Sequence, residues 1–436
     1  MIGRLLRALD RYWFAPARVR DLALFRIVCV GSGLFLFLPG PAWTQNAATG
    51  EPHFFRPLLV LKILMSPLGS WGVRPEPMFL HAVWLGTMAA GLCALVGKYT
   101  RLSLLVLAAG YTLLWGHLYS YGEVHHAQVL LAITFWVLAF SPSGAALSLD
   151  AWQQRRYATA YAMRFEPLSP TAESEFAGWP LRVVQWLLVL AYLSAGMSKL
   201  HDGGLAWMNG YTLAFYAAKD GIRWGMPFGI WIAQHPTVAA GLSIGAVLLE
   251  LTFVVAVLVP RLAWPYVLAG TALHTGIYLA QHAPFFEHIP LYVAFIGSLR
   301  RYPLWRRAPA AMPRRWTVVY DGMCPLCLRT MVTLDFLDLR RRLAYLNLET
   351  DWQRVTALAP RLTPEEARAA MVVIAPGGAR YSGLSAFRQL ARLLPPLWPA
   401  LPILHVPLST PVGGWLYDRV AANRKRLHCT ADACAF

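Results

Sequence analysis

Two cysteines separated by two residues are the clearest chemical signal in this chain. Cys324 and Cys327 stand in the run Asp321-Gly-Met-Cys-Pro-Leu-Cys327, directly after a run at 316–320 that is typical of a strand. A proline directly after the first cysteine suits the first turn of a helix. Cys324 is therefore expected at a helix N-terminus, where unpaired amides and the helix dipole favour the thiolate, the nucleophile of thiol–disulfide exchange.

A Cys-x-x-Cys pair can instead be half of a zinc site, or be chemically inert. The other cysteines, Cys29, Cys93, Cys429 and Cys434, form no second pair at this spacing and accompany no histidine pair at zinc-finger spacing. We therefore expect a redox dithiol and no metal. Asp321 is expected to be either a proton acceptor for the buried cysteine or the N-terminal cap of the helix. Cys429 and Cys434 are either a second redox pair or idle thiols in a C-terminal tail.

The elements that follow the dithiol predict a small α/β domain. A helical run covers 326–337, strand-like runs follow at 343–348 and 370–374, and an amphipathic stretch covers 384–394. This order is β-α-β followed by β and α, and a Cys-x-x-Cys pair near a β-α-β pattern is typical of thioredoxin-like proteins. The run Ala375-Pro-Gly-Gly378 predicts a hairpin turn rather than a nucleotide-binding loop.

The last quarter of the chain resembles the DCC thiol-disulfide oxidoreductase family. The hallmark of that family, Tyr-Asp-Gly-x-Cys-x-x-Cys, stands at 320–327, and the later runs at 381–386 and 417–424 also fit. The resemblance implies a thioredoxin-like fold for 316–436 and thiol–disulfide oxidoreductase activity through the dithiol. It also implies a thiol reductant protein as a partner.

Composition predicts that the rest of the chain is a membrane protein. Of 436 residues, 57% are hydrophobic and 14% are charged, whereas about 25% of residues are charged in soluble domains. Apolar runs of about 20 residues predict membrane-spanning helices. We expect eight spans, at 22–40, 79–97, 102–120, 126–143, 181–200, 238–259, 263–281 and 285–299. The expected fold class is a polytopic α-helical membrane domain followed by an α/β thioredoxin-like domain.

The charge distribution predicts the domain limits and the orientation. The net charge is +17, and positive residues mark the cytoplasmic side of membrane proteins. They gather in a basic arm at 1–20, in alternate connections of the membrane domain at 21–299, and in a proline-containing linker at 300–315 that is expected to contact membrane lipids. Both termini are therefore expected in the cytoplasm, beneath a bacterial inner membrane, where the dithiol is mostly reduced. This distribution argues against nucleic acid as a partner.

Ionisable side chains within the apolar runs mark a second candidate site, because each is costly in hydrocarbon. They are Arg26, His126, Lys199, Glu250 and His274. Arg26 and Glu250 are expected to form either a structural ion pair or part of a site, and His274 is either a packed or a catalytic histidine. His126 and Lys199 are expected at the same, extracytoplasmic level. Lys199 is expected to be a desolvated, unpaired amine rather than a lysine that reaches towards the interface.

Residues from about 20 to 300 resemble the vitamin K-dependent γ-carboxylase-like family, also called the horizontally transferred transmembrane (HTTM) domain. The resemblance rests on Ala195-Gly-Met-Ser-Lys-Leu200 and on Trp207-Met-Asn-Gly-Tyr211. It implies that Lys199 is the base that deprotonates a vitamin K-type hydroquinone and that His126 assists. A quinone or hydroquinone is the cofactor this would require. The supporting residues are Arg26, Trp207, Glu250 and His274.

Three functions follow from these observations. The best supported is a membrane-anchored thiol–disulfide oxidoreductase with a cytoplasmic dithiol, coupled to a γ-carboxylase-like membrane domain. A second is a quinone- or lipid-linked carboxylase or epoxidase-like enzyme with Lys199 as the base. A third is a membrane domain without enzymatic activity that acts as an anchor or as a platform for partners. Nothing in the sequence resembles the large lumenal module with which animal carboxylases hold their substrates, and this departure weakens the second reading.

Overall fold

The protein consists of two compact units, and the second unit is discontinuous in sequence. The computed structural model describes residues 2–40, 52–69, 74–122, 126–169, 172–301, 315–406 and 408–423. The first unit comprises Met1–Ser148 and Thr171–Arg306, and the second comprises Leu149–Pro170 and Arg307–Phe436. Residues 149–170 were expected in the membrane domain, whereas the structure groups this segment with the C-terminal unit.

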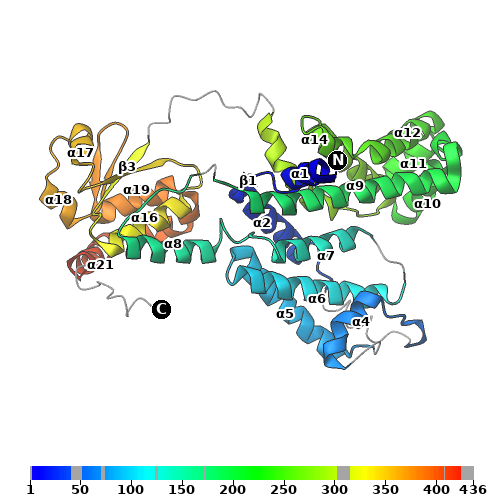
Figure 1. The fold of residues 1–436 in the computed structure, drawn as a ribbon, viewed down its shortest axis with the longest axis horizontal. Helices are drawn as coiled ribbons and strands as arrows, with labels where there is room; N and C mark the ends of the chain where they lie inside the picture. The colour runs from blue at the N-terminus through cyan, green and yellow to red at the C-terminus, as the bar shows by residue number, and fades with distance from the viewer. Residues whose placement is uncertain are drawn as a thin grey trace. The chain divides into compact units, whose positions relative to one another are not determined.

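The first unit is almost entirely helical (Figure 1), as expected for long apolar runs that satisfy their backbone hydrogen bonds internally. Its α-helices are α1 (Ile2–Trp13), α2 (Val19–Phe35), α4 (Leu59–Met65), α5 (Pro77–Val96), α6 (Thr100–Tyr119), α7 (His126–Ala139), α9 (Glu175–Gly203), α10 (Tyr211–Trp224), α11 (Pro227–Ala233), α12 (Pro236–Thr252), α13 (Val255–Leu258), α14 (Ala263–Gln281) and α15 (His288–Leu291). Its short 3-10 helices are η1 (Pro52–Phe54), η2 (Ser66–Leu68), η3 (Gly204–Asn209) and η4 (Tyr292–Arg301).

Length and composition support fewer membrane spans than the sequence predicted. Among the described residues, three helical segments are long and apolar enough to cross a membrane: α5, α6 and α9 together with η3. A fourth results if α11 and α12, which meet at 103°, are counted as one bent span. The expected number of eight is not supported, because several apolar runs form short or interrupted helices. For example, α7 has 14 residues and is about 21 Å long, against a hydrocarbon core of about 30 Å.

The core of the first unit encloses a charged side chain. Arg26 of α2 is completely buried, and its Nη1 and Nη2 atoms donate to the carbonyl oxygens of Ser143 at 3.0 Å and Leu147 at 2.6 Å. Gly97 ends α5 with a φ of 72°, and a Cβ there would lie 3.0 Å from Arg26 Nη1 and closer still to Ser148. Glycine is therefore needed at this turn for both its conformation and its size.

A short two-stranded sheet ties the N-terminal segment to the start of α9. Strand β1 (Ala17–Arg18) pairs antiparallel with β2 (Glu173–Ser174). The hydroxyl of Ser174 then accepts the backbone N–H of Phe176 and caps the N-terminus of α9. Serine is among the preferred residues for this position, because its oxygen satisfies one of the unpaired amides of the first turn.

The C-terminal unit contains a mixed four-stranded sheet in the order β4-β3-β5-β6. Strand β3 (Trp316–Tyr320) pairs parallel with β4 (Leu343–Asn347) and antiparallel with β5 (Val372–Ile374), which pairs antiparallel with β6 (Arg380–Ser382). Gly378 has a φ of 84° in the β5–β6 connection. The hairpin predicted from the sequence is therefore confirmed.

Helices cover this sheet and complete its core. They are α8 (Leu149–Ala162), α16 (Pro325–Leu337), α17 (Trp352–Leu358), α18 (Pro364–Ala369), α19 (Gly383–Leu393), η6 (Pro395–Ala400), α20 (Leu401–His405) and α21 (Ser409–Asn423). Helix α8 lies alongside α16 (Figure 1). Phe165, which follows α8, is buried in one core cluster with Val318, Tyr320 and Leu328. The segment that separates α7 from α9 in the sequence is thus part of the C-terminal core.

Candidate functional site

The dithiol lies where β3 ends and α16 begins. Cys324 is the N-cap residue of α16, with an extended backbone, and Pro325 is the first residue of the helix. The carbonyl oxygen of Cys324 accepts the N–H of Leu328 at 3.0 Å, the first hydrogen bond of the helix. The position predicted for Cys324 from the following proline is therefore confirmed. Cys327 lies one turn further on, within reach of Cys324.

The surroundings of Cys324 favour its thiolate. A hydrogen bond from the Cys327 thiol is the main cause that lowers the pKa of Cys324 to about 6. Burial raises this pKa, and the backbone N–H groups of Cys327 and Leu326 lower it further. The nearby charge of Asp321 acts in the opposite direction and raises this pKa. Cys324 is buried, whereas Cys327 is partly exposed. A thiol with a pKa near 6 is mostly ionised at neutral pH, and the thiolate is the reactive form.

Asp321 stabilises the loop in front of the dithiol. Its Oδ1 atom accepts the backbone N–H of Met323 at 2.9 Å. The N-cap position itself belongs to Cys324, so Asp321 caps the turn rather than the helix. A Cβ on Gly322 would lie 2.4 Å from the amide of Asn347, at the end of β4. The glycine after Asp321 therefore allows the loop to pass this strand end, and the sequence alone gave no sign of Asn347.

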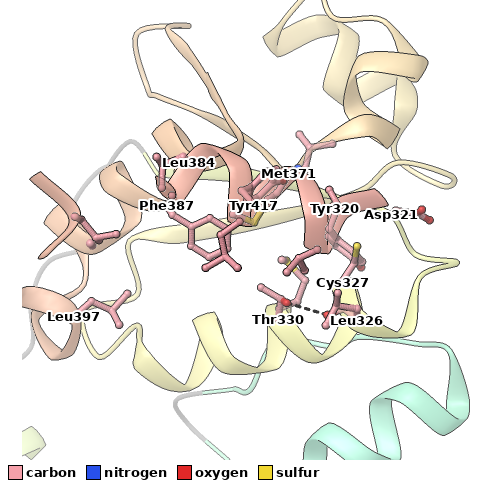
Figure 2. Close-up of a pocket in the computed structure, with 18 of the residues that line it drawn as sticks. Tyr320, Asp321, Leu326, Cys327, Thr330, Met371, Leu384, Phe387, Leu397 and Tyr417 are labelled. Atoms are coloured by element: carbon pink, nitrogen blue, oxygen red, sulfur yellow. Dashed lines mark hydrogen bonds between the residues drawn. The ribbon is translucent and has the colours of Figure 1, made fainter. Parts of the chain in front are cut away.

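An apolar pocket of about 470 Å³ lies beside Cys327 (Figure 2). Its walls come from β3, α16, α19 and the C-terminal helices up to α21. The apolar side chains labelled in Figure 2 include Leu326, Met371, Leu384 and Phe387. Cys324 does not line this pocket among the described residues, so the dithiol presents Cys327 to it. The pocket was not predictable from the sequence, because its walls come from segments far apart in the chain.

The second candidate site joins Lys199 and Glu250. Lys199 Nζ donates to both carboxylate oxygens of Glu250, at 2.7 and 2.8 Å, and lies 5.2 Å from the centre of the Trp207 ring. The ion pair expected between Arg26 and Glu250 is therefore wrong: α2 directs Arg26 to backbone carbonyls, while α9 and α12 pack together and pair Lys199 with Glu250. The expectation of an unpaired amine at Lys199 is wrong for the same reason.

His274 lies in the same cavity as Lys199 and Glu250. The cavity has a volume of about 150 Å³ and also includes Tyr192 and His288. His274 Nε2 shares a hydrogen bond of 2.9 Å with the hydroxyl of Tyr192, which also bonds to the hydroxyl of Tyr292. The His274 and His288 rings stack with their centroids 4.6 Å apart. Both tyrosines and His288 were not predicted from the sequence, because they lie in ordinary apolar runs and carry no motif.

Three of the predicted residues are not placed by the structure. His126 begins α7, but its side chain lies outside the described part of the chain, so its relation to Lys199 stays a prediction. Cys429 and Cys434 also lie outside the described residues. Within the described ranges, no group of three or more His, Cys, Asp or Glu side chains is arranged to hold a metal ion.

Comparison with known families divides the chain into two parts. The HTTM domain family matches residues 67–286, half of the chain. The chain belongs to this family. The DCC1-like thiol-disulfide oxidoreductase family matches residues 318–430, so the fusion of the two domains predicted from the sequence is confirmed. No curated protein and no solved structure matches the chain.

The HTTM domain and its apolar helices indicate a membrane protein, and the DCC1-like match indicates oxidoreductase activity. Lys199, Trp207, Glu250 and His274 all lie within the HTTM match, whereas Arg26 lies before it. The segment 149–170 also falls within the HTTM match, although it packs in the C-terminal unit. The boundary between the two families in sequence therefore differs from the boundary between the two units in space.

Proposed function

We propose that the protein is a membrane-bound thiol–disulfide oxidoreductase in which Cys324 is the nucleophile and Cys327 the resolving thiol. The lowered pKa of Cys324, about 6, carries this proposal, because it provides a thiolate at neutral pH. The mixed sheet with a Cys-x-x-Cys pair after its first strand supports a thioredoxin-like fold. The DCC1-like match supports the same chemistry.

In the proposed reaction, Cys324 Sγ attacks one sulfur of a substrate disulfide, and the other sulfur leaves as a thiolate that takes up a proton. Cys327 then attacks the Cys324 sulfur of the mixed disulfide and releases the second substrate thiol. Two electrons pass from the protein dithiol to the substrate, and the protein holds a disulfide. Asp321, which lines the same pocket as Cys327, is proposed to accept the proton of Cys327. A thiol reductant protein would regenerate the dithiol.

We place this dithiol in the cytoplasm, beneath a bacterial inner membrane. Segments 149–170 and 307–436 form one unit, so the chain between them must leave and return on the same side of the membrane. This requires an even number of crossings, which α9 and the bent pair α11–α12 would provide. The arginines of both segments favour the cytoplasmic side. In that compartment the dithiol acts as a reductant or sensor.

Trapping of mixed disulfides in the full-length protein tests this proposal. Cys327→Ser removes the resolving thiol and should lengthen the lifetime of the mixed disulfide, whereas Cys324→Ser should abolish trapping. Cys93→Ser is the matched control, because Cys93 is an exposed free cysteine of the first unit. Equal trapping by the two dithiol variants would refute the assigned roles, and stoichiometric bound zinc would favour a metal site instead.

A second function is favoured by the cavity that contains Lys199, Glu250 and His274. We propose that this cavity transfers protons to or from a small substrate group, with Lys199 as the base. Lys199 is paired with Glu250, so it can act as a base only after the pair has lost a proton. His274 lines the same cavity and is a second group that can accept or donate a proton. The cavity of about 150 Å³ is smaller than the roughly 300–1,000 Å³ of ordinary ligand pockets, so these residues do not fit a whole quinone with its side chain.

A further inference from the structure

We propose that the pocket beside Cys327 binds the substrate of the dithiol, and that this substrate is an uncharged disulfide carried on an apolar organic group. The inference rests on the oxidoreductase function proposed above and names its substrate class. The position, size, polarity and charge of the pocket support this substrate class. Together they argue against the more common hydrophilic disulfides as substrates.

Position and size make the pocket a binding site. Its volume of about 470 Å³ lies within the range of pockets that hold small organic ligands. Cys327 lies on its wall, one helical turn after the nucleophile. Leu384, Phe387 and Leu397 line the same pocket (Figure 2), so a molecule bound there has its apolar body against these side chains.

Two polar side chains of the pocket are already engaged within the protein. The Thr330 hydroxyl donates to the carbonyl oxygen of Leu326 at 2.8 Å, and the Tyr417 hydroxyl accepts the N–H of Met371 at 2.9 Å. A peptide inserted here would bury backbone amides and carbonyls among apolar side chains, and each unpaired polar group costs free energy. The pocket therefore favours an apolar organic group over a peptide chain.

Charge further narrows the substrate class. Among the described residues that line the pocket, only Asp321 carries a charge, and Figure 2 shows it at the edge. No cationic side chain in this lining compensates a buried anion. An anionic disulfide would lose its hydration without gaining a partner, and it would also be repelled by Asp321. The pocket thus selects against carboxylate-bearing disulfides, such as those of charged peptides.

The reaction is balanced without a further reactant. Cys324 Sγ bonds to one ligand sulfur and the ligand disulfide breaks, so one apolar thiol leaves and the other half stays attached beside the pocket. Cys327 Sγ then bonds to Cys324 Sγ and releases the second thiol. The ligand gains two electrons, one product thiol takes the Cys327 proton and the other takes a proton from solvent, and the protein dithiol is oxidised to a disulfide.

A matched pair of disulfides tests the inference on the reduced, full-length protein. The probes are diphenyl disulfide and its dicarboxylate analogue. The rate constant for each probe is divided by the rate constant with which dithiothreitol reduces the same probe, which removes the intrinsic reactivity of the disulfide. We expect the corrected rate constant to be at least about tenfold higher for the uncharged probe, because only the charged one loses hydration without compensation.

Two substitutions on α21 locate the effect. Leu416 lines the pocket and is 56% exposed, whereas Val412 is 59% exposed and lies outside the lining. Leu416→Asp should lower the rate constant for diphenyl disulfide by about tenfold and leave that for hydroxyethyl disulfide unchanged, since a charge in the wall disfavours only the apolar ligand. Val412→Asp should match the wild type with both probes.

The outcomes separate this inference from the function on which it rests. Equal corrected rates for the two diphenyl probes, together with an unaffected Leu416→Asp variant, would overturn the substrate class but leave the oxidoreductase function standing. A preference for peptide disulfides over diphenyl disulfide would overturn it too. Failure to reduce any disulfide, hydroxyethyl disulfide included, would refute the proposed function and the inference together.

Discussion

Arg155 Nη1 donates to Asp335 Oδ2 at 2.6 Å, which joins two residues 180 positions apart in the sequence. The other oxygen of Asp335 accepts Arg341 Nη1 at 2.6 Å, and Oδ2 also accepts the N–H of Leu168 at 3.1 Å. Asp335 is buried. A single buried carboxylate therefore binds an arginine from the HTTM match and another from the DCC1-like match.

Aromatic packing and a further hydrogen bond also join segment 149–170 to the rest of the C-terminal unit. The Phe165 ring packs against those of Tyr320 and Tyr345, with centroids 5.8 and 5.0 Å apart. The indole N–H of Trp152 donates to the Thr333 hydroxyl at 3.3 Å. Helix α16, which carries the dithiol at its N-terminus, therefore packs against α8. We expect residues 315–436 alone to lack part of their core.

Removal of the shared carboxylate should destabilise the C-terminal unit. Asp335→Ala leaves two arginines without their buried partner, and breaking such a pair costs about 3–5 kcal/mol. Brief proteolysis of the C-terminal unit in increasing denaturant measures the loss, because the protease cleaves the unfolded unit.

Glu349→Ala is the control for Asp335→Ala. Glu349 pairs with Arg368 at 3.1 Å, but both side chains are exposed, at 38% and 55%. Exposed pairs contribute about 0–1 kcal/mol. If the C-terminal unit of the two variants is cleaved at the same denaturant concentration, the connection through α8 does not stabilise the dithiol domain.

The reactivity of Cys324 should follow its lowered pKa. The rate of alkylation in the full-length protein should rise with pH and reach half its maximum near pH 6. Cys327→Ala removes the main hydrogen bond that stabilises the thiolate and should move the midpoint to higher pH. Asp321→Asn removes an opposing charge and should move it to lower pH. A midpoint in the ordinary thiol range, near about 8.5, would contradict the proposed nucleophile.

The same pKa makes the stability of the reduced form depend on pH. The folded pKa of Cys324, about 6, is lower than that of an unfolded thiol. The unfolded state therefore binds more protons between the two values, and the free energy of unfolding should increase as the pH rises from about 6. This contribution is lost as the pH falls through 6. Cys324→Ser, which cannot ionise in this range, should reduce the slope with pH in denaturant titrations of the reduced protein by the contribution of this one group.

Local features were predictable from the sequence, whereas partners distant in the chain were not. Proline after Cys324 indicated the helix start, because it acts within one turn. The pairing of Lys199 with Glu250 depends on how α9 and α12 pack, and no local pattern contains that information. Arg155 looked like one of several arginines that mark a cytoplasmic loop, and only the tertiary structure pairs it with Asp335.

The Lys199–Glu250 pair should stabilise the first unit as well as serve any proton transfer. Lys199→Ala leaves the buried Glu250 carboxylate unpaired and should destabilise the unit by about 3–5 kcal/mol. The double variant Lys199→Met with Glu250→Gln removes both charges and should recover much of this loss. Lys219→Ala is the control, because Lys219 is 50% exposed and lies 3.7 Å from Asp220. Thermal unfolding of the detergent-solubilised protein measures all three.

A role of Lys199 as a base has a separate signature. Lys199→Arg keeps the charge and the ion pair, so a structural lysine tolerates it, whereas a base does not, because arginine stays protonated. A folded Lys199→Arg variant should therefore lose the phenotype or activity that depends on the first unit. Full activity of this variant, together with full activity of His126→Ala, would leave the HTTM domain as an anchor.

The two segments of the C-terminal unit should lie on one side of the membrane. Arg164 follows α8 and is 77% exposed at its side chain, so Arg164→Cys reports the location of segment 149–170. In a variant that carries Arg164→Cys and lacks the exposed Cys93, an impermeant maleimide should label the introduced cysteine only after the inner membrane is permeabilised. Alkaline phosphatase fused after Phe436 should be inactive. If both sites are extracytoplasmic, the orientation and the argument for a reducing compartment reverse. If they lie on opposite sides, Arg155 cannot bind Asp335, and the joint unit is refuted.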